Sequence, residues 1–341
     1  MHEAAWIAIG LLGLLLLVVA VAMLRYITLA RWQKSIHHAW FESGWCPGDQ
    51  CGMESRTDLG LPQVKGTTDF DLPLARIMMD YVVRIEKRSF RNATDADLIT
   101  PPGHTELERY VPSQYRAPPL AVAWRVNGTG TVVLSFRCTV TDEEIQEDLR
   151  ATQVDWDTGD TCHQPRSLCM SAALVHGDRA QVHQGFYGVY RNYRQLWRDR
   201  IQTEQPDTLL IAGHSLGGGL ATLTALDMAE TMGPWLRRIL VYVCGTPRVG
   251  NGAFHTRLKS HPRITLWRLV NDTDLIQNMP PHVHPNLERP DMRPFYYEHT
   301  GSEYRFNTNW GAWKHNHFLP VYLDHLHAQQ PETAAPNAPN P

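Results

Sequence analysis

The residues best suited to chemistry lie at positions 213–217, which read Gly-His-Ser-Leu-Gly. The apolar run Thr208–Ala212 predicts a strand before them, and Leu216–Glu230 predicts a helix after them. A serine between such elements stands on a tight turn at a helix N-terminus, where backbone N–H groups and the helix dipole stabilise a negatively charged oxygen. Small flanking residues permit that turn. The pattern predicts Ser215 as a nucleophile for acyl transfer, and the strand and helix disfavour the alternative of a glycine-rich turn with an incidental serine.

A nucleophile on this type of turn is followed along the chain by an acid and then by a histidine. A strand is predicted at Ile264–Val270, and Asp274 follows it closely. Asp272 is the runner-up, and its ordinary role would be to cap the turn. Asp227 lies on the predicted helix after the nucleophile, and we expect it on the solvated face. Asp274 is therefore the expected acid.

The histidine is harder to select because seven candidates follow the acid: His282, His284, His299, His315, His317, His325 and His327. His317 stands directly before the apolar stretch 318–323, which could anchor its loop. A metal site built from this histidine-rich region is the alternative, but no helix-spaced set such as HExxH occurs there. We therefore expect His317 to act as the base and the other histidines to lie on the surface.

The elements that must position these residues alternate along the chain. Helices are predicted at Leu72–Lys87, at Tyr187–Ile201 and after His317. Strands are predicted at Leu120–Arg125, Thr131–Phe136 and Ile239–Val243, with a hairpin turn at Asn127-Gly128 between the first two. A loop is predicted at Arg91–Pro119. This order predicts an α/β fold whose central sheet is mostly parallel and is covered by helices on its faces.

The start of the chain is its one compositional extreme, because Ala4–Leu24 is an unbroken apolar run of a length that spans a bilayer. Basic residues follow the run (Arg25, Arg31 and Lys34) and none precedes it, which favours a single-pass membrane anchor with the catalytic part on the cytoplasmic side. The alternative is a cleaved signal peptide, since Ala20-Val21-Ala22 resembles a cleavage site.

The remaining composition is that of a globular protein. Of the 341 residues, 43% are hydrophobic and 20% charged, with a formal net charge of −3, which gives no electrostatic bias toward nucleic acid. The predicted organisation is an anchor with a basic flank at 1–34, a linker or irregular wrap at 35–70, a catalytic domain at 71–328 and a disordered tail at 329–341. The six cysteines do not decide the compartment.

Five blocks of sequence, in order, resemble one known family. They are residues 132–139, 182–186, 213–218, 245–251, and 271–274 with 280–281. The chain is similar in these blocks to the class 3 lipases, the family of the fungal triacylglycerol lipases, over about residues 120–325. This resemblance implies an α/β-hydrolase fold and hydrolysis of carboxylic esters through an acyl-enzyme, with no metal and no organic cofactor.

The resemblance also implies roles for single residues. Thr139 ends the block that supplies one oxyanion-hole donor in the family, and the backbone N–H of Leu216 supplies the other. Asp274 is implied as the acid, and His317 as the base because Tyr322-Leu323 follow it as in plant-type members. Cys138 departs from the family, which usually has Gly there, and Ile276-Gln277 replaces the usual Val-Pro. The segment 141–149 occupies the position of the family's lid but is strongly acidic, so a long apolar lid is not expected.

Together these observations predict a serine hydrolase for lipid esters, either acylglycerols or phospholipids. The lipid assignment depends on the predicted anchor, which would hold the site where such molecules are concentrated. Expected partners are a lipid ester and the membrane, and not nucleic acid. The alternatives are a soluble secreted esterase for non-lipid esters and a catalytically silent lipid-binding scaffold, which a missing member of the serine–histidine–acid triad would indicate.

Overall fold

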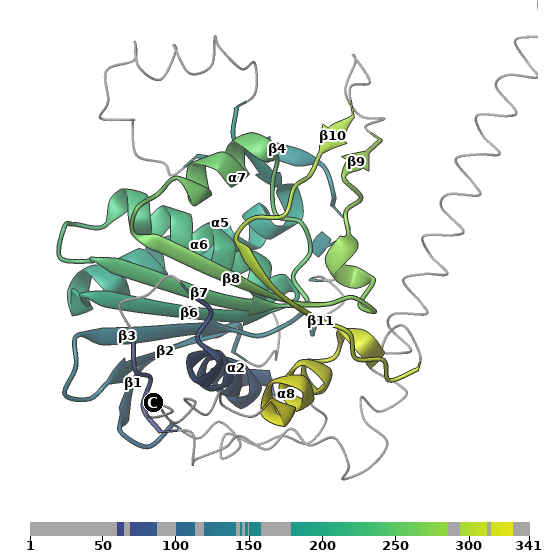
Figure 1. Ribbon diagram of the computed structural model, residues 1–341. Coiled ribbons are helices and arrows are strands. Elements are labelled where there is room, and N and C mark those ends of the chain that lie inside the picture. Colours follow the sequence, from purple (N-terminus) through teal and green to yellow (C-terminus); the bar gives the residue numbers. More distant parts are fainter. Residues whose placement is uncertain are drawn as a thin grey trace, which may run out of the picture. The chain divides into compact units, whose positions relative to one another are not determined.

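A seven-stranded sheet forms the frame of the described part of the chain (Figure 1). The computed structural model describes residues 60–64, 69–86, 100–112, 119–140, 144, 147–148, 150–157, 179–285, 294–311 and 315–329. The strand order is β1-β2-β3-β6-β7-β8-β11. The pairs β1–β2 and β2–β3 are antiparallel, and the four remaining pairs are parallel. The prediction of a mostly parallel central sheet is confirmed.

The strands of this sheet have the following bounds: β1 His104–Tyr110, β2 Ala121–Val126, β3 Thr131–Phe136, β6 Thr208–His214, β7 Arg238–Cys244, β8 Ile264–Asn271 and β11 Ser302–Phe306. Two small antiparallel pairs stand apart from it: β4 Gln153–Asp155 with β5 Gln181–His183, and β9 Val283–His284 with β10 Phe295–Tyr296. The β2–β3 hairpin turns at the predicted Asn127-Gly128, where Gly128 has φ 74°.

Helices cover both faces of the sheet (Figure 1). Their bounds are α2 Leu72–Glu86, α5 Gln184–Glu204, α6 Leu216–Thr231, α7 Gly252–Lys259 and α8 Leu319–Ala328, with 3-10 turns η6 Ile276–Asn278 and η7 His315–His317. Helices α5 and α6 pack into one apolar core, and α2 and α8 pack into the other. Each face of the parallel strands is therefore covered, which is the usual setting of a parallel sheet.

The centre of the fold is strand β6 with the helix that follows it. Every residue of β6 is buried, and α6 is buried from Leu216 to Ala229. A strand that is apolar on both faces needs helices on both sides, which the alternating sequence supplies. The junction between β6 and α6 is thus held between two cores, and it carries the pentapeptide 213–217.

One predicted loop is wrong. Residues 91–119 were expected to lack regular structure, but His104–Tyr110 form β1 at the edge of the sheet. Most residues of β1 are only partly buried, and the strand carries Glu106, Glu108 and Arg109. A charged strand is well suited to a sheet edge, and its order comes from pairing with β2 rather than from its own apolar pattern.

The expectation for Asp227 is also wrong. This residue has no exposed surface and lies in α6 opposite Arg198 of α5, whose Nε donates to Asp227 Oδ2 at 2.9 Å. The apolar character of α6 extends around the whole helix, so a position that would face water on an amphipathic helix is covered here by α5. The buried carboxylate is tolerated because it is paired.

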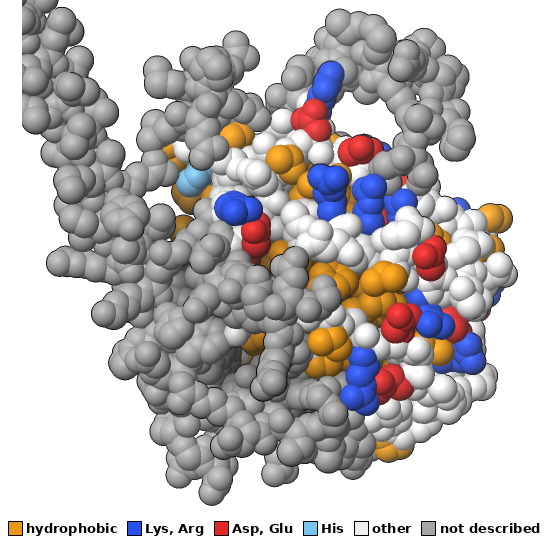
Figure 2. Space-filling view, turned by 180° about the vertical axis from the view of Figure 1, so that it is seen from behind, with side chains coloured by type: hydrophobic (Ala, Val, Ile, Leu, Met, Phe, Trp, Pro, Cys, Tyr) orange, Lys and Arg blue, Asp and Glu red, His pale blue; other side chains and the backbone are white. Residues whose placement is uncertain are grey.

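Acidic and basic side chains are interspersed on the surface face shown in Figure 2. Exposed ion pairs include Arg237 with Asp207 at 2.7 Å and Arg179 with Asp155 at 3.2 Å. Charges of opposite sign therefore lie close together on this face.

The helices within the described ranges are all too short or too polar to cross a membrane. The predicted anchor at 4–24, its basic flank, most of the predicted linker at 35–70 and the tail beyond residue 329 lie outside those ranges. Their assignments, and the domain boundaries built on them, stay predictions.

Candidate active site

Ser215 stands on a sharp turn between β6 and α6. Its backbone has φ 54° and ψ −121°, a left-handed conformation that is strained for a residue with a side chain. A Cβ added at Gly213 would lie 2.3 Å from the Gly217 carbonyl oxygen, and one at Gly217 would lie 2.4 Å from the Arg137 carbonyl oxygen. Both positions therefore require glycine, and the close approach at Gly217 brings the end of β3 against the start of α6.

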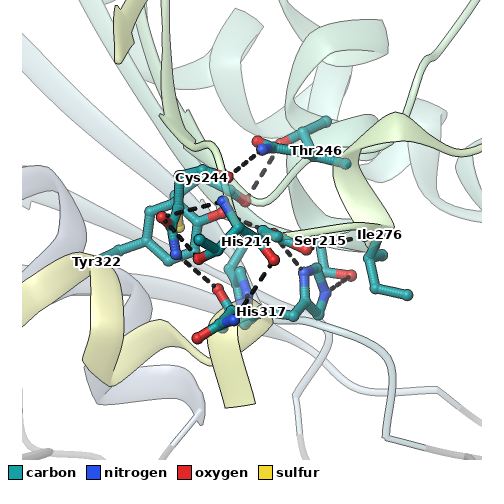
Figure 3. A network of polar contacts seen from close by, with 12 residues as sticks. His214, Ser215, Cys244, Thr246, Ile276, His317 and Tyr322 are labelled. Carbon is teal, nitrogen blue, oxygen red and sulfur yellow. Dashed lines mark hydrogen bonds and ion pairs between the residues drawn. The ribbon is translucent and has the colours of Figure 1, made fainter. Parts of the chain in front are cut away.

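The imidazole of His317 lies between Ser215 and Asp274. His317 Nε2 is 2.9 Å from Ser215 Oγ (Figure 3). His317 Nδ1 is 2.8 Å from Asp274 Oδ2. All three residues are buried, with exposed fractions of 4% or less. The three residues selected from the sequence thus meet in one hydrogen-bonded chain, although 102 positions separate Ser215 from His317. Such a chain can transfer the serine proton to the imidazole and hold the resulting cation beside a carboxylate.

Asp274 is held by several donors in the turn after β8. Its Oδ1 accepts the Ile276 backbone N–H at 2.9 Å, and its Oδ2 accepts the Tyr322 hydroxyl at 2.6 Å besides facing His317. The runner-up Asp272 is exposed and pairs with Arg305 on the surface. Only Asp274 of these two carboxylates contacts the imidazole.

Leu216 and Thr139 are the two predicted oxyanion donors. Leu216 opens α6, so its backbone N–H has no acceptor within the helix and is aligned with the helix dipole. Thr139 is buried just beyond β3, but its hydroxyl donates to Asp148 Oδ2 at 2.5 Å. Burial raises the pKa of Asp148 to about 8, against a smaller lowering effect of the Thr139 hydrogen bond. The availability of the Thr139 proton to a substrate therefore depends on the protonation of Asp148.

Cys138, which stands where the class 3 lipases usually have Gly, fits its position without backbone strain. Among the described residues other than glycine, only Gln205 and Ser215 have positive φ, so Cys138 does not need the glycine conformation. Its thiol is free and buried. In the acidic segment 141–149, Glu144 receives two hydrogen bonds from the buried Arg137 guanidinium, at 2.9 and 3.0 Å. An ion pair between Glu144 and Arg137 therefore attaches this part of the segment to the end of β3.

Other histidines of the C-terminal region have structural contacts. His282 Nδ1 faces the Tyr297 carbonyl at 2.7 Å, and the His325 ring stacks on Phe306 with a centroid distance of 3.9 Å. One group of metal-ligand types was not anticipated: Glu86, Cys138 and His214 place ligand atoms within 4.8 Å of one another. It lies in the interior beside the triad, and none of its three members belongs to the histidine-rich region considered above.

Three supporting residues escaped prediction from the sequence. Tyr322 was quoted only as part of a motif, and its hydroxyl proves to bond Asp274. Asn271 donates to the carbonyls of Thr308 and Asn316, which attaches the loop before His317 to the end of β8. Glu86 lies 128 positions from its partner His214, so no local pattern pointed to it.

Comparison with known proteins adds independent observations. Residues 133–284 match the family model described as class 3 lipase. The chain is 32% identical over 178 residues to the chloroplastic phospholipase A(1) DAD1 of Arabidopsis thaliana, an alignment that covers 49% of this chain and 37% of that protein. It is 28% identical over 120 residues to a lipase of Rhizopus niveus, with coverage of 32% and 30%. The chain thus spans well under half the length of these curated relatives.

The fold is also shared with solved lipase structures. A Rhizomucor miehei lipase propeptide complex, a deletion mutant, is 22% identical and superposes with a TM-score of 0.50, over 74% of this chain and 76% of that chain. This likeness concerns the fold alone. The match over residues 133–284 confirms the resemblance to the class 3 lipases that the five sequence blocks predicted.

Proposed function

We propose that this chain is a serine carboxylic-ester hydrolase that acts on lipid esters, either phospholipids or acylglycerols. The observation that carries the proposal is the buried chain of hydrogen bonds from Ser215 Oγ through His317 to Asp274. The class 3 lipase match supports carboxylic-ester hydrolysis as the reaction. The strained conformation of Ser215 supports a functional role for the turn, because such strain persists mainly at functional sites.

In the proposed acylation step, His317 Nε2 takes the Ser215 hydroxyl proton while Oγ attacks the ester carbonyl carbon. The carbonyl oxygen becomes an oxyanion that accepts hydrogen bonds from the Leu216 N–H and the Thr139 donors. Asp274 holds the imidazole in the tautomer with a proton on Nδ1 and stabilises the imidazolium. The tetrahedral intermediate then breaks its bond to the alcohol oxygen, which leaves with the proton from His317.

The second half of the reaction repeats this sequence with water. His317 takes a proton from a water molecule, the hydroxide oxygen attacks the acyl carbon, and Ser215 Oγ leaves with the proton returned by His317. The products are a carboxylic acid and the free enzyme. Every proton transfer involves one imidazole, which the Asp274 carboxylate keeps oriented throughout.

Two observations support a lipid as substrate, and the predicted anchor agrees with them. The matched relatives include proteins named as a phospholipase A(1) and a lipase. Leu275 and Met279, which border the η6 turn directly after Asp274, expose 56% and 46% of their surface. Apolar side chains this exposed next to the acid of the site favour contact with acyl chains. The anchor predicted at 4–24 would hold the site at a bilayer, and the cytoplasmic orientation belongs to the same proposal.

The test compares hydrolysis by the wild-type chain and two serine variants. Dioleoyl phosphatidylcholine vesicles, a diacylglycerol emulsion and p-nitrophenyl acetate serve as substrates. Ser215→Ala should reduce every rate by several orders of magnitude, while Ser260→Ala, which alters an exposed serine outside the site, should match the wild type.

The substrate range separates the alternatives. Efficient hydrolysis of the long-chain lipids supports the proposal. Activity confined to the soluble acetate would replace the lipid assignment with a soluble esterase. Lipid binding without any Ser215-dependent hydrolysis would identify a catalytically silent scaffold.

A further inference from the structure

A buried carboxylate on helix α2 connects two parts of the active site. Glu86 is the last residue of α2 and exposes 1% of its surface. Its Oε1 accepts the Cys138 backbone N–H at 3.0 Å, directly before Thr139, and lies 2.8 Å from His214 Nδ1. Glu86 lies outside the class 3 lipase match at 133–284. It therefore reaches the site through the fold and not through any of the family blocks.

His214 extends this connection to the base. Its Nε2 is 2.8 Å from the backbone carbonyl oxygen of His317, and the two imidazole rings are 5.0 Å apart (Figure 3). A carbonyl oxygen only accepts hydrogen bonds, so Nε2 must carry a proton. The second proton, on the side of Nδ1, is then held between His214 and the Glu86 carboxylate. Burial lowers the pKa of His214, but the charge and hydrogen bond of Glu86, the hydrogen bond to the His317 carbonyl and the charge of Asp274 together raise the pKa overall.

The arrangement is costly for the fold alone. Glu86 Oε2 is buried and has no hydrogen-bond partner among the described residues. A negative charge at the C-terminus of a helix is also unfavourable, because the helix dipole is negative there. An apolar residue would fill this interior position at lower free energy. We therefore attribute the carboxylate to its two hydrogen bonds, one with the His214 ring and one with the Cys138 backbone N–H.

We propose that Glu86 and His214 are positioning residues for the catalytic base. In this assignment, which rests on the proposed function, Glu86 fixes the ring of His214, and the His214 Nε2–H fixes the backbone of His317. The imidazole of His317 is then held at hydrogen-bond distance from Ser215 Oγ. The same Glu86 oxygen restrains Cys138, so the base and the oxyanion segment are aligned from one point on α2.

A metal ion bound by Glu86, Cys138 and His214 is the competing account of this cluster. Both ring nitrogens of His214 already face oxygen atoms at 2.8 Å, and Glu86 Oε1 already accepts a backbone N–H. A metal would have to displace one of these hydrogen bonds. The observed geometry therefore favours the hydrogen-bonded arrangement.

The experiment uses the full chain and the variants Glu86→Gln, His214→Gln and their combination. The side-chain amide of the Glu86→Gln variant still accepts from Cys138, but it cannot balance a cationic imidazole, so His214 keeps one proton and loses one of its two hydrogen bonds. Asp80→Asn is the matched control, because Asp80 is also buried on α2 and pairs with Arg84 at 2.7 Å. Near-UV circular dichroism and thermal midpoints verify folding, and if one single variant does not fold, the other decides.

We expect Glu86→Gln and His214→Gln to lower kcat by about 10- to 100-fold while KM changes by less than about twofold, since a small displacement of a reacting group affects the chemical step. The double variant should be within about twofold of the worse single variant, because both changes interrupt one connection. Asp80→Asn should retain the wild-type kcat and KM.

Three results would overturn the assignment: a kcat of Glu86→Gln within twofold of the wild type, full additivity in the double variant, or loss of wild-type activity in EDTA with recovery on adding zinc. Failure of the proposed function itself appears separately, as a wild-type chain without hydrolysis that depends on Ser215.

Discussion

Replacing Asp274 by asparagine tests the triad with the smallest change in shape. The carboxylate accepts three hydrogen bonds, from His317 Nδ1 at 2.8 Å, from the Tyr322 hydroxyl at 2.6 Å and from the Ile276 N–H at 2.9 Å. An amide has only one oxygen, so it cannot accept all three. The variant must therefore leave donors facing each other on one side of residue 274.

Either orientation of the amide has a chemical consequence. If its NH2 group faces His317, Nδ1 becomes an acceptor, the ring proton moves to Nε2, and the base cannot take the Ser215 proton. If its oxygen faces His317, the NH2 group meets the buried Ile276 N–H, and the imidazolium loses its compensating charge. We expect kcat to fall by about 10³- to 10⁴-fold, the effect that a wrong tautomer has in serine–histidine–aspartate enzymes. This corresponds to about 4–5.5 kcal/mol of transition-state free energy.

Asp272→Asn is the matched control, two positions away. Asp272 is exposed and pairs with Arg305, and such surface pairs contribute only about 0–1 kcal/mol to stability. Initial rates with p-nitrophenyl butyrate should therefore stay at the wild-type level in this variant. Equal losses in the two variants, or a larger loss in Asp272→Asn, would refute the assignment of Asp274 as the acid.

Three further predictions concern the oxyanion segment and the core. Thr139→Val should lower kcat by about 10²- to 10³-fold if its hydroxyl binds the oxyanion, whereas a wild-type rate would mean that backbone donors suffice. The pKa of Asp148 is raised to about 8, so below that pH Asp148 is protonated and can donate to Thr139, which leaves the Thr139 proton for the oxyanion. We therefore expect kcat to fall as the pH rises through about 8, and Asp148→Asn to remove this fall. An unchanged pH profile in Asp148→Asn would show that Asp148 does not control the Thr139 proton. Asp227→Ala should lower the free energy of unfolding in urea by about 3–5 kcal/mol because it removes the carboxylate that faces the buried Arg198 guanidinium, and a loss below about 1 kcal/mol would contradict this.

The turn that carries Ser215 was predictable because its signals are local. The turn at Ser215 needs glycine at 213 and 217, and a strand and a helix on either side, all within about 25 residues of sequence. Selecting Asp274 and His317 required the order of elements as well. Asp274 and His317 could be ranked by their place after a strand and before an apolar stretch, and the structure brings both to hydrogen-bond distance of their partners.

The supporting residues were not predictable because their signals are not local. Glu86 is an ordinary helical residue in the sequence, and only the packing of α2 against the sheet brings it to His214. Tyr322 looks like part of an apolar anchor, yet its hydroxyl bonds the acid. Tertiary packing determines these contacts, and a single sequence contains no record of it.

The two wrong structural predictions have the same origin. Strand β1 is charged because it lies at the sheet edge, so its sequence resembles a loop until its pairing with β2 is known. Asp227 resembles a surface residue until α5 is placed over it. In β1 and at Asp227, polar residues are held by contacts with β2 and with Arg198, neither of which adjoins them in the sequence.

Covalent labelling is the most direct test of Ser215 as the nucleophile. The full chain and Ser215→Ala are treated with a fluorophosphonate and then mapped by mass spectrometry of peptides. We expect one adduct per wild-type chain, located on Ser215, and none on the variant. An unlabelled wild-type chain, or equal labelling of the Ser215→Ala variant at another residue, would contradict it.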